Sequence, residues 1–264
     1  MPGPSELLAA YDAQLRVIVP DPLPEGWIVD RDGPLTTFRG LGDRAWVLYR
    51  DLGGLEGAAL DELIARQVRH FSELGERFEW KYHGHDLPVD LPDRLLAHGF
   101  EPEELETIEI GRVADIAAPP RPPEGVTLRE VAALADLERI AEMESEVWGE
   151  DHSEYAPQLA AEIAADPGAI TVVIAEAGDR VVSAAWMRFE RGTEFATMWG
   201  GATLAEWRGR GIYRALVAHR ANLAADRGFR YLETDASKDS QPILERLGFV
   251  PVTTTTPFVW SPPA

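Results

Sequence analysis

Cysteine is absent from this chain of 264 residues, and no apolar run approaches the length of a membrane span. Without cysteine the protein cannot contain a disulfide framework, a thiolate metal site or a cysteine nucleophile. Because a spanning helix needs about 20 consecutive apolar residues, we expect no membrane partner. The first residues also lack the basic and apolar regions of a signal peptide. These absences predict a cytoplasmic protein.

Basic residues are few. Lysine and arginine together number 25 against 45 acidic residues, for a formal net charge of −20, and the only lysines are Lys81 and Lys238. Nucleic acid is a poor partner for such a surface, because its binding depends on neutralising phosphates. A single Arg-Gly-Arg-Gly string at 208–211 lies between strand and helix patterns and is not interpreted as an RNA-binding segment. The acidity favours solubility and would also attract small cations.

One short glycine motif stands out among the residues that are present. Residues 207–214 read W-R-G-R-G-I-Y-R, follow an apolar run at 195–204 and open a helical pattern that stops at Arg227-Gly228. Glycine lets the main chain approach an anion closely, and the first turn of a helix leaves unpaired N–H donors. The pattern therefore predicts a phosphate-binding turn.

The elements around this turn follow a recognisable order. Next come a strand pattern at 229–235, a short helix at 241–247, the tripeptide Leu-Gly-Phe and a last strand that runs to Trp260. Upstream lie a strand at 126–131, helices at 134–148 and 154–165, and a hairpin at 170–190.

This order resembles the GNAT superfamily of coenzyme A-dependent N-acyltransferases. The family motif R/Q-x-x-G-x-G/A is matched by Arg208, Gly211 and, imperfectly, Tyr213. The resemblance covers 126–260 in detail, which is about half of the chain.

A weaker copy of the pattern occupies the first half. Several residues recur at one constant offset: Tyr82 and Tyr231, Asp86 and Asp235, Gly99 and Gly248, Phe100 and Phe249, Pro102 and Pro251. A proline-rich stretch at 117–123 separates the copies and favours an extended linker. We therefore predict two GNAT-like lobes, 1–117 and 118–264. Each is expected to be an α/β (α+β) mixed sheet, largely antiparallel and flanked by helices.

The first lobe is expected to be degenerate. The same offset aligns 208–213 with 59–64, which contain Asp61 and Glu62 and no glycine. Acidic side chains suit a free helix N-terminus but would repel a pyrophosphate. Gly53, Gly54 and Gly57 lie nearby, but their spacing does not fit the motif.

The resemblance implies acetyl-CoA as the acyl donor. The pantetheine arm would lie beside 199–204 like an added strand, and main-chain amides of 208–213 would hold the pyrophosphate, with charge from Arg208, Arg210 and Arg214. The cofactor-binding residues expected are Ala202, Leu204, Arg208, Gly209, Arg210, Gly211, Ile212, Tyr213, Ser237 and Ser240. No metal ligands are expected, since the H-x-H spacing of His83 and His85 lacks a third ligand.

Catalytic residues are harder to assign. The positions at which many family members carry a glutamate base and a tyrosine acid are Thr197 and Leu244 here, and neither can perform the role. Asp235 is the candidate base, with helix capping as its structural alternative. Three glutamates near hairpin ends (Glu176, Glu190 and Glu194) are expected to be solvated. His152 and Tyr155 fall in the region that covers the acceptor in the family, with His152 in an exposed loop.

An aromatic and thioether group completes the candidate site. Trp186, Met187, Met198 and Trp199 lie on adjacent strand patterns, and some of them could hold an ammonium group by cation–π attraction. The function predicted is N-acetyl transfer from acetyl-CoA to a primary amine of a small molecule or peptide, by a monomer or homodimer. Two alternatives stay open: a catalytically silent acyl-CoA-binding module, and transfer of an acyl group other than acetyl.

Overall fold

The computed structural model describes residues 2–40 and 42–263. Its helices are α1 (Pro4–Gln14), α2 (Gly57–Leu74), α3 (Leu91–Ala97), α4 (Val113–Ile116), α5 (Leu134–Trp148), α6 (Tyr155–Ala165), α7 (Ile212–Asp226) and α8 (Gln241–Arg246), with a 3₁₀ turn at Ala205–Trp207. Its strands are β1 (Ile28–Asp32), β2 (Leu35–Arg39), β3 (Arg44–Tyr49), β4 (Arg77–His83), β5 (Glu101–Pro102), β6 (Glu106–Arg112), β7 (Val126–Val131), β8 (Ile170–Ala177), β9 (Arg180–Phe189), β10 (Phe195–Thr203), β11 (Tyr231–Ala236) and β12 (Val250–Trp260).

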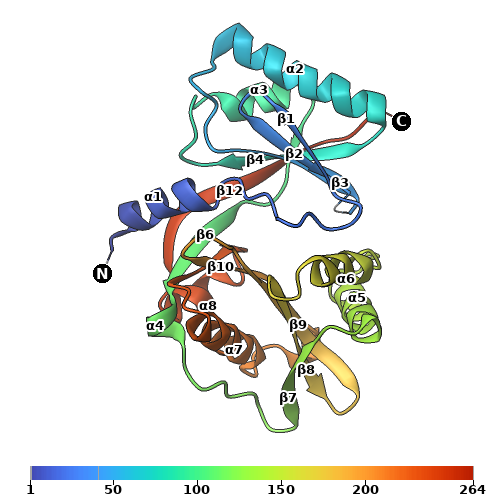
Figure 1. The fold of residues 1–264 in the computed structure, drawn as a ribbon, viewed down its shortest axis with the longest axis vertical. Coiled ribbons are helices and arrows are strands. Elements are labelled where there is room, and N and C mark those ends of the chain that lie inside the picture. Colours follow the sequence, from blue (N-terminus) through green and yellow to red (C-terminus); the bar gives the residue numbers. More distant parts are fainter. Residues whose placement is uncertain (1, 41, 264) are drawn as a thin grey trace.

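One mixed sheet runs through the whole molecule (Figure 1). The strand order is β1-β2-β3-β4-β12-β6-β11-β10-β9-β8-β7, and β5 pairs with β12. Most pairs are antiparallel, and the parallel pairs are β3 with β4 and β10 with β11. The predicted α/β fold with a mixed, largely antiparallel sheet flanked by helices is therefore confirmed, but the two halves share one sheet instead of having one sheet each.

The two halves share an order of elements. In each half a long helix connects the two strands of a parallel pair, as β3-α2-β4 and as β10-α7-β11. A short helix and a closing strand follow, α3 and β6 in the first half, α8 and β12 in the second.

The closing strands are exchanged between the halves. Strand β6 comes from the first half but pairs with β11, and β12 comes from the second half but pairs with β4. The two strands also pair with each other. The proposed division at 117/118 thus separates the halves along the chain, while main-chain hydrogen bonds of the sheet join them in space.

Helices cover both faces of the sheet (Figure 1). On one face, α2 and α3 bury Phe78 and Trp80 in the first half, and α7 buries Met198 and Leu232 in the second. On the other face, α5 and α6 cover β8 and β9, and α1 packs at the centre through Leu7 and Tyr11. No helix of the described residues is both long and apolar enough to cross a membrane.

Glu109 of β6 is an unusual core residue, since it is 0 % exposed and neither carboxyl oxygen has a hydrogen-bond partner among the described residues. Burial, with the charge of Glu245 nearby, raises its pKa from 4.5 to about 7. A carboxyl group whose pKa is higher in the folded state stabilises the fold below the unfolded pKa and loses that contribution as the pH rises through the folded value.

We therefore expect Glu109→Gln to gain stability relative to the wild type as the pH rises from 4 to 8. The change in the free energy of unfolding should differ by about 2 kcal/mol between these two pH values. Urea unfolding at both values measures it, with the exposed Glu104→Gln as the matched control. A Glu109→Gln effect that is the same at pH 4 and pH 8 would contradict the assignment.

Candidate active site

Strands β10 and β11 separate at the centre of the second half. They pair only through Phe195–Tyr231, Ala196–Leu232 and Thr197–Glu233, although β10 continues to Thr203. Beyond Thr197, one edge of β10 therefore has no neighbouring strand. An open strand edge presents main-chain donors and acceptors that an extended ligand can pair with.

A bulge shapes this open segment. The register between β10 and β9 shifts between Gly200 and Ala202, and Gly200 and Gly201 have φ values of 67° and 92°. A Cβ atom on Gly201 would lie 2.9 Å from the ring of Tyr213, and one on Gly200 would lie 2.6 Å from the ring of Trp186. The two glycines are required both by backbone conformation and by space. The ring of Tyr213, which departs from the family motif, is accommodated by packing on Gly201.

The bulge corrects the expected main-chain partners of the cofactor. The amide of Leu204 donates to Val182 of β9, and its carbonyl accepts from Trp207. Main-chain groups alternate between the two sides of a strand, so those of Ala202 also face β9. The carbonyl of Thr203 faces away from β9 and accepts from Nε of Arg208 at 2.9 Å. Gly201 and Thr203, rather than Ala202 and Leu204, line the open edge.

The turn before α7 has the geometry of an anion site. Gly209 and Gly211 are exposed, with φ values of 72° and 88°. Helix α7 starts at Ile212, Gly211 provides no side-chain cap and no acidic residue lies in the first turn. The amides of Ile212, Tyr213 and Arg214 precede the first helical hydrogen bond, which Ala215 donates to Gly211.

The arginine side chains around this turn are held differently. Arg208 bonds to Thr203, Arg210 lies 4.7 Å over the ring of Trp207, and Arg214 is exposed. Arg210 and Arg214 thus stay accessible to an anion at the start of α7.

The corresponding opening in the first half is filled by the chain itself. Strands β3 and β4 pair from Arg44–Arg77 to Val47–Trp80 and then part. Arg16, just after α1, donates from Nε to the carbonyl of Tyr49 at 3.3 Å. This carbonyl lies on the strand that corresponds to β10.

Buried polar groups hold Arg16 in this opening. Arg16 also donates from Nη2 to Asp86 at 2.8 Å, and Asp86 accepts from the hydroxyl of Tyr49 and from the amide of His83. A cofactor in the first half would have to displace Arg16, whose charge is already paired with Asp86 within the protein.

The expected alignment of 59–64 with the phosphate turn is wrong. Helix α2 starts at Gly57 with Glu56 as its N-cap, so Asp61 and Glu62 lie inside the helix. The loop before α2 contains Gly53 and Gly54, both with positive φ. A constant offset fails here because the loop that precedes α2 differs in length from the one that precedes α7.

Three predicted residues already have partners within the protein. Ser237 and Ser240 bond to each other through their hydroxyl groups at 3.2 Å, and the carbonyl of Ser237 accepts from the amides of Ser240 and Gln241 at the start of α8. Asp235 forms an ion pair with Lys81 of β4. Lys81 contacts Asp235 across β12 and β6, the two exchanged strands that lie between β4 and β11 in the sheet.

Side chains on one face of the sheet form a polar cluster opposite α7. We call it the polar face, and its members are Glu79 and Lys81 of β4, Glu106 of β6, Thr197 and Trp199 of β10, Glu190, and Glu233 and Asp235 of β11. They share a face because they are cross-strand partners or lie two residues apart along a strand. Glu233 lies directly opposite Thr197, at the point where β10 and β11 separate.

Glu190 was expected to be solvated, but it is only partly exposed and has a hydrogen-bond partner within the protein. Thr197 donates from Oγ1 to Glu190 at 2.8 Å, and Trp199 donates from Nε1 to Thr197 at 2.9 Å. Burial raises the pKa of Glu190. The carboxylate missing at position 197 is thus present one hydrogen bond away.

Two other glutamates are also paired rather than merely solvated. Glu176 pairs with Arg129 and Arg139, and Glu194 pairs with Arg230.

Two tryptophans from different halves stack beside this cluster. Trp46 of β3 lies parallel to Trp199, with ring centroids 6.4 Å apart, and Arg188 lies 4.8 Å over Trp199. Trp199 is 37 % exposed. Of the predicted aromatic and thioether group, only Trp199 lies on the polar face with an accessible ring.

The other members of that group are core residues. Met187 and Met198 are buried in the core beneath α7, and Trp186 packs against Tyr155 at 5.7 Å.

The loop between α5 and α6 is less exposed than expected. The side chain of His152 is 12 % exposed, and its ring lies 4.9 Å from that of Tyr155. Burial, with the charge of Glu144, raises the pKa of Tyr155 to about 12. Burial also raises the pKa of Glu144 to about 7. Both shifts favour the neutral form of the group relative to its ordinary behaviour.

Several residues of this region were not identified from the sequence. Glu233, Lys81 and Trp46 belong to separate strands, and only the sheet brings them together. Arg220 of α7 is fully buried and donates to the carbonyls of Trp186 and Trp199, next to the bulge. Burial lowers its pKa to about 10. An arginine at a core position of an amphipathic helix was the available signal.

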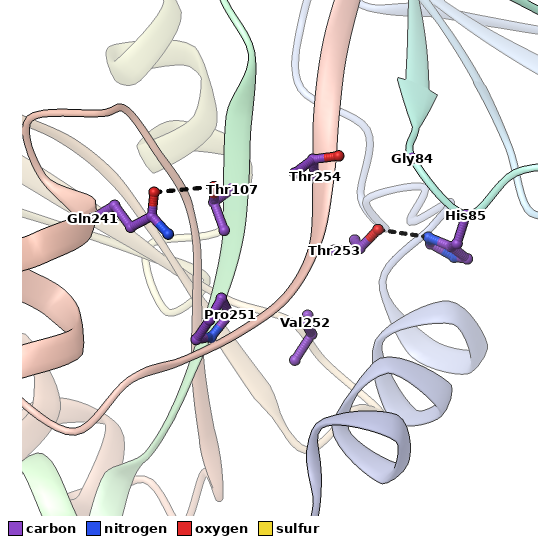
Figure 2. A pocket seen from close by; sticks show the side chains of 8 residues that line it. All are labelled: Gly84, His85, Thr107, Gln241, Pro251, Val252, Thr253 and Thr254. Atoms are coloured by element: carbon purple, nitrogen blue, oxygen red, sulfur yellow. Dashed lines mark hydrogen bonds between the residues drawn. The ribbon is translucent and has the colours of Figure 1, made fainter.

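A separate cavity of about 420 Å³ opens where the exchanged strands cross (Figure 2). Its lining includes Thr107, which bonds to Gln241, and His85, which bonds to Thr253. His83 bonds to Tyr11, so both histidines of the H-x-H pattern have protein partners. Among residues 2–40 and 42–263, no group of three or more His, Cys, Asp or Glu could hold a metal ion.

Comparison with known proteins agrees with this geometry. Residues 137–249 match the model of the Acetyltransferase (GNAT) family. The chain is similar in structure to a GCN5-related N-acetyltransferase from Kribbella flavida, with a TM-score of 0.66, 17 % identity and coverage of 99 % of this chain and 95 % of that one.

Two further solved structures are similar. A tandem GNAT protein from the clavulanic acid biosynthesis pathway has a TM-score of 0.62 and 16 % identity, over 91 % of this chain and 85 % of that one. A GCN5-related N-acetyltransferase from Sphaerobacter thermophilus has a TM-score of 0.61 and 15 % identity, over 88 % and 82 %. Comparison with curated protein sequences finds no match.

At these identities the structures establish the fold, and the family match covers the β10-α7-β11 unit with its open edge and glycine turn. Residues 137–249, which contain that unit, match the GNAT family of acetyltransferases, and the chain as a whole has the fold of GNAT structures.

Proposed function

We propose that the protein transfers an acetyl group from acetyl-CoA directly to a primary amine, with the cofactor in the second half only. The observation that carries the proposal is the exposed, uncapped start of α7 next to the open edge of β10. Free amides and the helix dipole would hold the pyrophosphate, and the strand edge at Gly201 and Thr203 would pair with the pantetheine arm. The first half serves as a support, because Arg16 fills its opening.

Glu233 is the proton acceptor of the proposed reaction. The amine nitrogen attacks the thioester carbonyl carbon, the C–S bond breaks, and the amine loses a proton to a carboxylate. Burial, with the charge of Asp235, raises the pKa of Glu233 well above its ordinary value. A raised pKa makes a carboxylate a stronger base. Asp235 is less suited, because Lys81 already pairs with it.

The leaving thiolate takes its proton from water. Leu244, at the usual position of the tyrosine acid, is fully buried in the core beneath α7. Much of the catalytic effect would then come from positioning the amine against the thioester.

Release of free thiol from acetyl-CoA over a panel of amines tests the proposal. We expect amine-dependent release by the wild type and a fall in kcat of about 100-fold in Glu233→Gln, which is a typical contribution of a general base. Glu194→Gln is the matched control, because that residue pairs with Arg230 away from the polar face. Tight acetyl-CoA binding without release for any amine would instead identify a silent acyl-CoA-binding module.

A further inference from the structure

The polar face holds more negative charge than its own cations balance. Its carboxyl groups are Glu79, Glu106, Glu190, Glu233 and Asp235. Lys81 pairs with Asp235. Arg44, at its margin, pairs with Glu79 at 3.1 Å and with Glu103 at 2.6 Å.

The remaining arginine at this face is also engaged. Arg188 forms two hydrogen bonds of 2.6 Å with Glu162 of α6. In the described part of the chain, no basic side chain pairs with Glu106, Glu190 or Glu233.

Glu233 is the buried member of this set of unpaired carboxyl groups. The residue is only 6 % exposed, yet no basic, amide or hydroxyl group of the described residues donates a hydrogen bond to it. A buried carboxyl group without a cationic partner favours its neutral form, and a cation that binds beside it favours the carboxylate. Burial and neighbouring carboxylates raise the pKa of Glu233 and bring that of Glu106 to about 7.

The stacked tryptophans are an independent observation. Trp199 remains 37 % exposed at the centre of a sheet and next to Thr197, and Trp46 extends the stack from the first half. Because Arg188 already lies 4.8 Å over the ring of Trp199, the exposed part of the tryptophan pair offers an alkylammonium ligand an apolar contact for its methylene chain.

We infer that the amine acceptor carries a second cationic group, which pairs with Glu106 while the reacting amine lies between Glu233 and Trp199. This inference rests on the proposed function and names its substrate class. One amine becomes a neutral amide, and the other keeps its charge and its carboxylate partner.

The strand register sets the spacing of the two cations. Glu233 lies opposite Ile110 of β6, four residues from Glu106 on the same strand. At about 3.3 Å per residue, the two carboxylates are roughly 13 Å apart along the sheet. The long side chains can shorten this span, so a linear diamine or polyamine fits better than a compact one.

The test compares linear monoamines with α,ω-diamines of the same length from four to ten carbons. We expect kcat/KM from thiol release to favour the long diamines by about tenfold or more, the factor expected for one partly buried ion pair. In Glu106→Gln this ratio should fall toward 1. Glu104→Gln, whose residue pairs with Lys238 on the surface, should keep it.

The two proposals fail in different ways. If no amine releases thiol, the proposed function is wrong. If monoamines and diamines react equally well, or if Glu106→Gln keeps the preference for diamines, the proposed acetyl transfer is supported and the second-cation site is wrong. Calorimetric binding of 1,8-diaminooctane and of 1-aminooctane to the wild-type protein without acetyl-CoA gives a readout that needs no variant. Equal affinities there would also overturn the inference.

Discussion

Gly211→Asp is expected to abolish acetyl-CoA binding, with a loss of at least about 100-fold in affinity. The residue caps α7 with φ of 88°, and a Cβ atom there would meet nothing within 4 Å. The new carboxylate would therefore fit without a steric clash and lie where the pyrophosphate should bind. Two like charges in contact at the start of a helix oppose each other strongly.

Two control variants separate charge from conformation. Gly211→Asn carries the same backbone strain without charge, since Asn tolerates a positive φ, and should bind within about tenfold of the wild type. Gly54→Asp, before α2, adds the same charge to the first half and should have no effect. Thermal shifts measure binding, because a ligand at 100 times its Kd stabilises a protein by about 2.7 kcal/mol. Full stabilisation of Gly211→Asp, or its loss in Gly54→Asp, would place the cofactor elsewhere.

Arg16→Met is expected to have the largest effect on stability, a loss of about 3–5 kcal/mol in the free energy of unfolding. The side chains of Arg16 and Asp86 are 1 % and 6 % exposed. Removing the guanidinium leaves the Asp86 carboxylate buried without its cation, and leaves the carbonyl of Tyr49 without this donor. Arg66→Met is the control, because the exposed Arg66–Asp32 pair should contribute less than about 1 kcal/mol.

The pH dependence of this effect has a definite sign. Burial alone would raise the pKa of Asp86, but bonding to His83 and the charge of Arg16 lower it below its ordinary value of 3.8. A lowered carboxyl pKa stabilises the fold above the unfolded pKa, and that stability is lost as the pH falls through the folded value. Denaturant unfolding at pH 7 and pH 3 should show a smaller effect of Arg16→Met at pH 3. A loss under 1 kcal/mol in the free energy of unfolding at pH 7 would mean that Arg16 contributes little to stability.

Local patterns were sufficient for the second half. The helical spacing of α5, α6 and α7, the turn glycines and the apolar strands β8 and β9 lie where they were predicted. Each depends on residues a few positions apart, because helix periodicity, caps and glycine turns are short-range effects. The glycine turn at 208–213 also depends only on neighbouring residues.

The repeat between the two halves was a less reliable guide than these local patterns. The short helix predicted at 241–247 is α8, but the constant offset misplaced the start of α2, because loop lengths differ between the halves. The main-chain partners at 202 and 204 were misassigned for a related reason. One bulge at Gly200–Gly201 reverses the direction of every group that follows it.

The amino-acid sequence by itself indicated a GNAT fold with a glycine-rich turn before a long helix in the second half, because strand, turn and helix patterns are encoded by neighbouring residues. Only the tertiary structure decided what surrounds that turn. The exchange of β6 and β12 joins the halves in one sheet, in which Lys81 contacts Asp235 and Trp46 stacks on Trp199, and tertiary packing also places Arg16 beside Asp86. These partners are 70 or more residues apart in the chain, so their contacts depend on sheet pairing and burial, which no local pattern specifies.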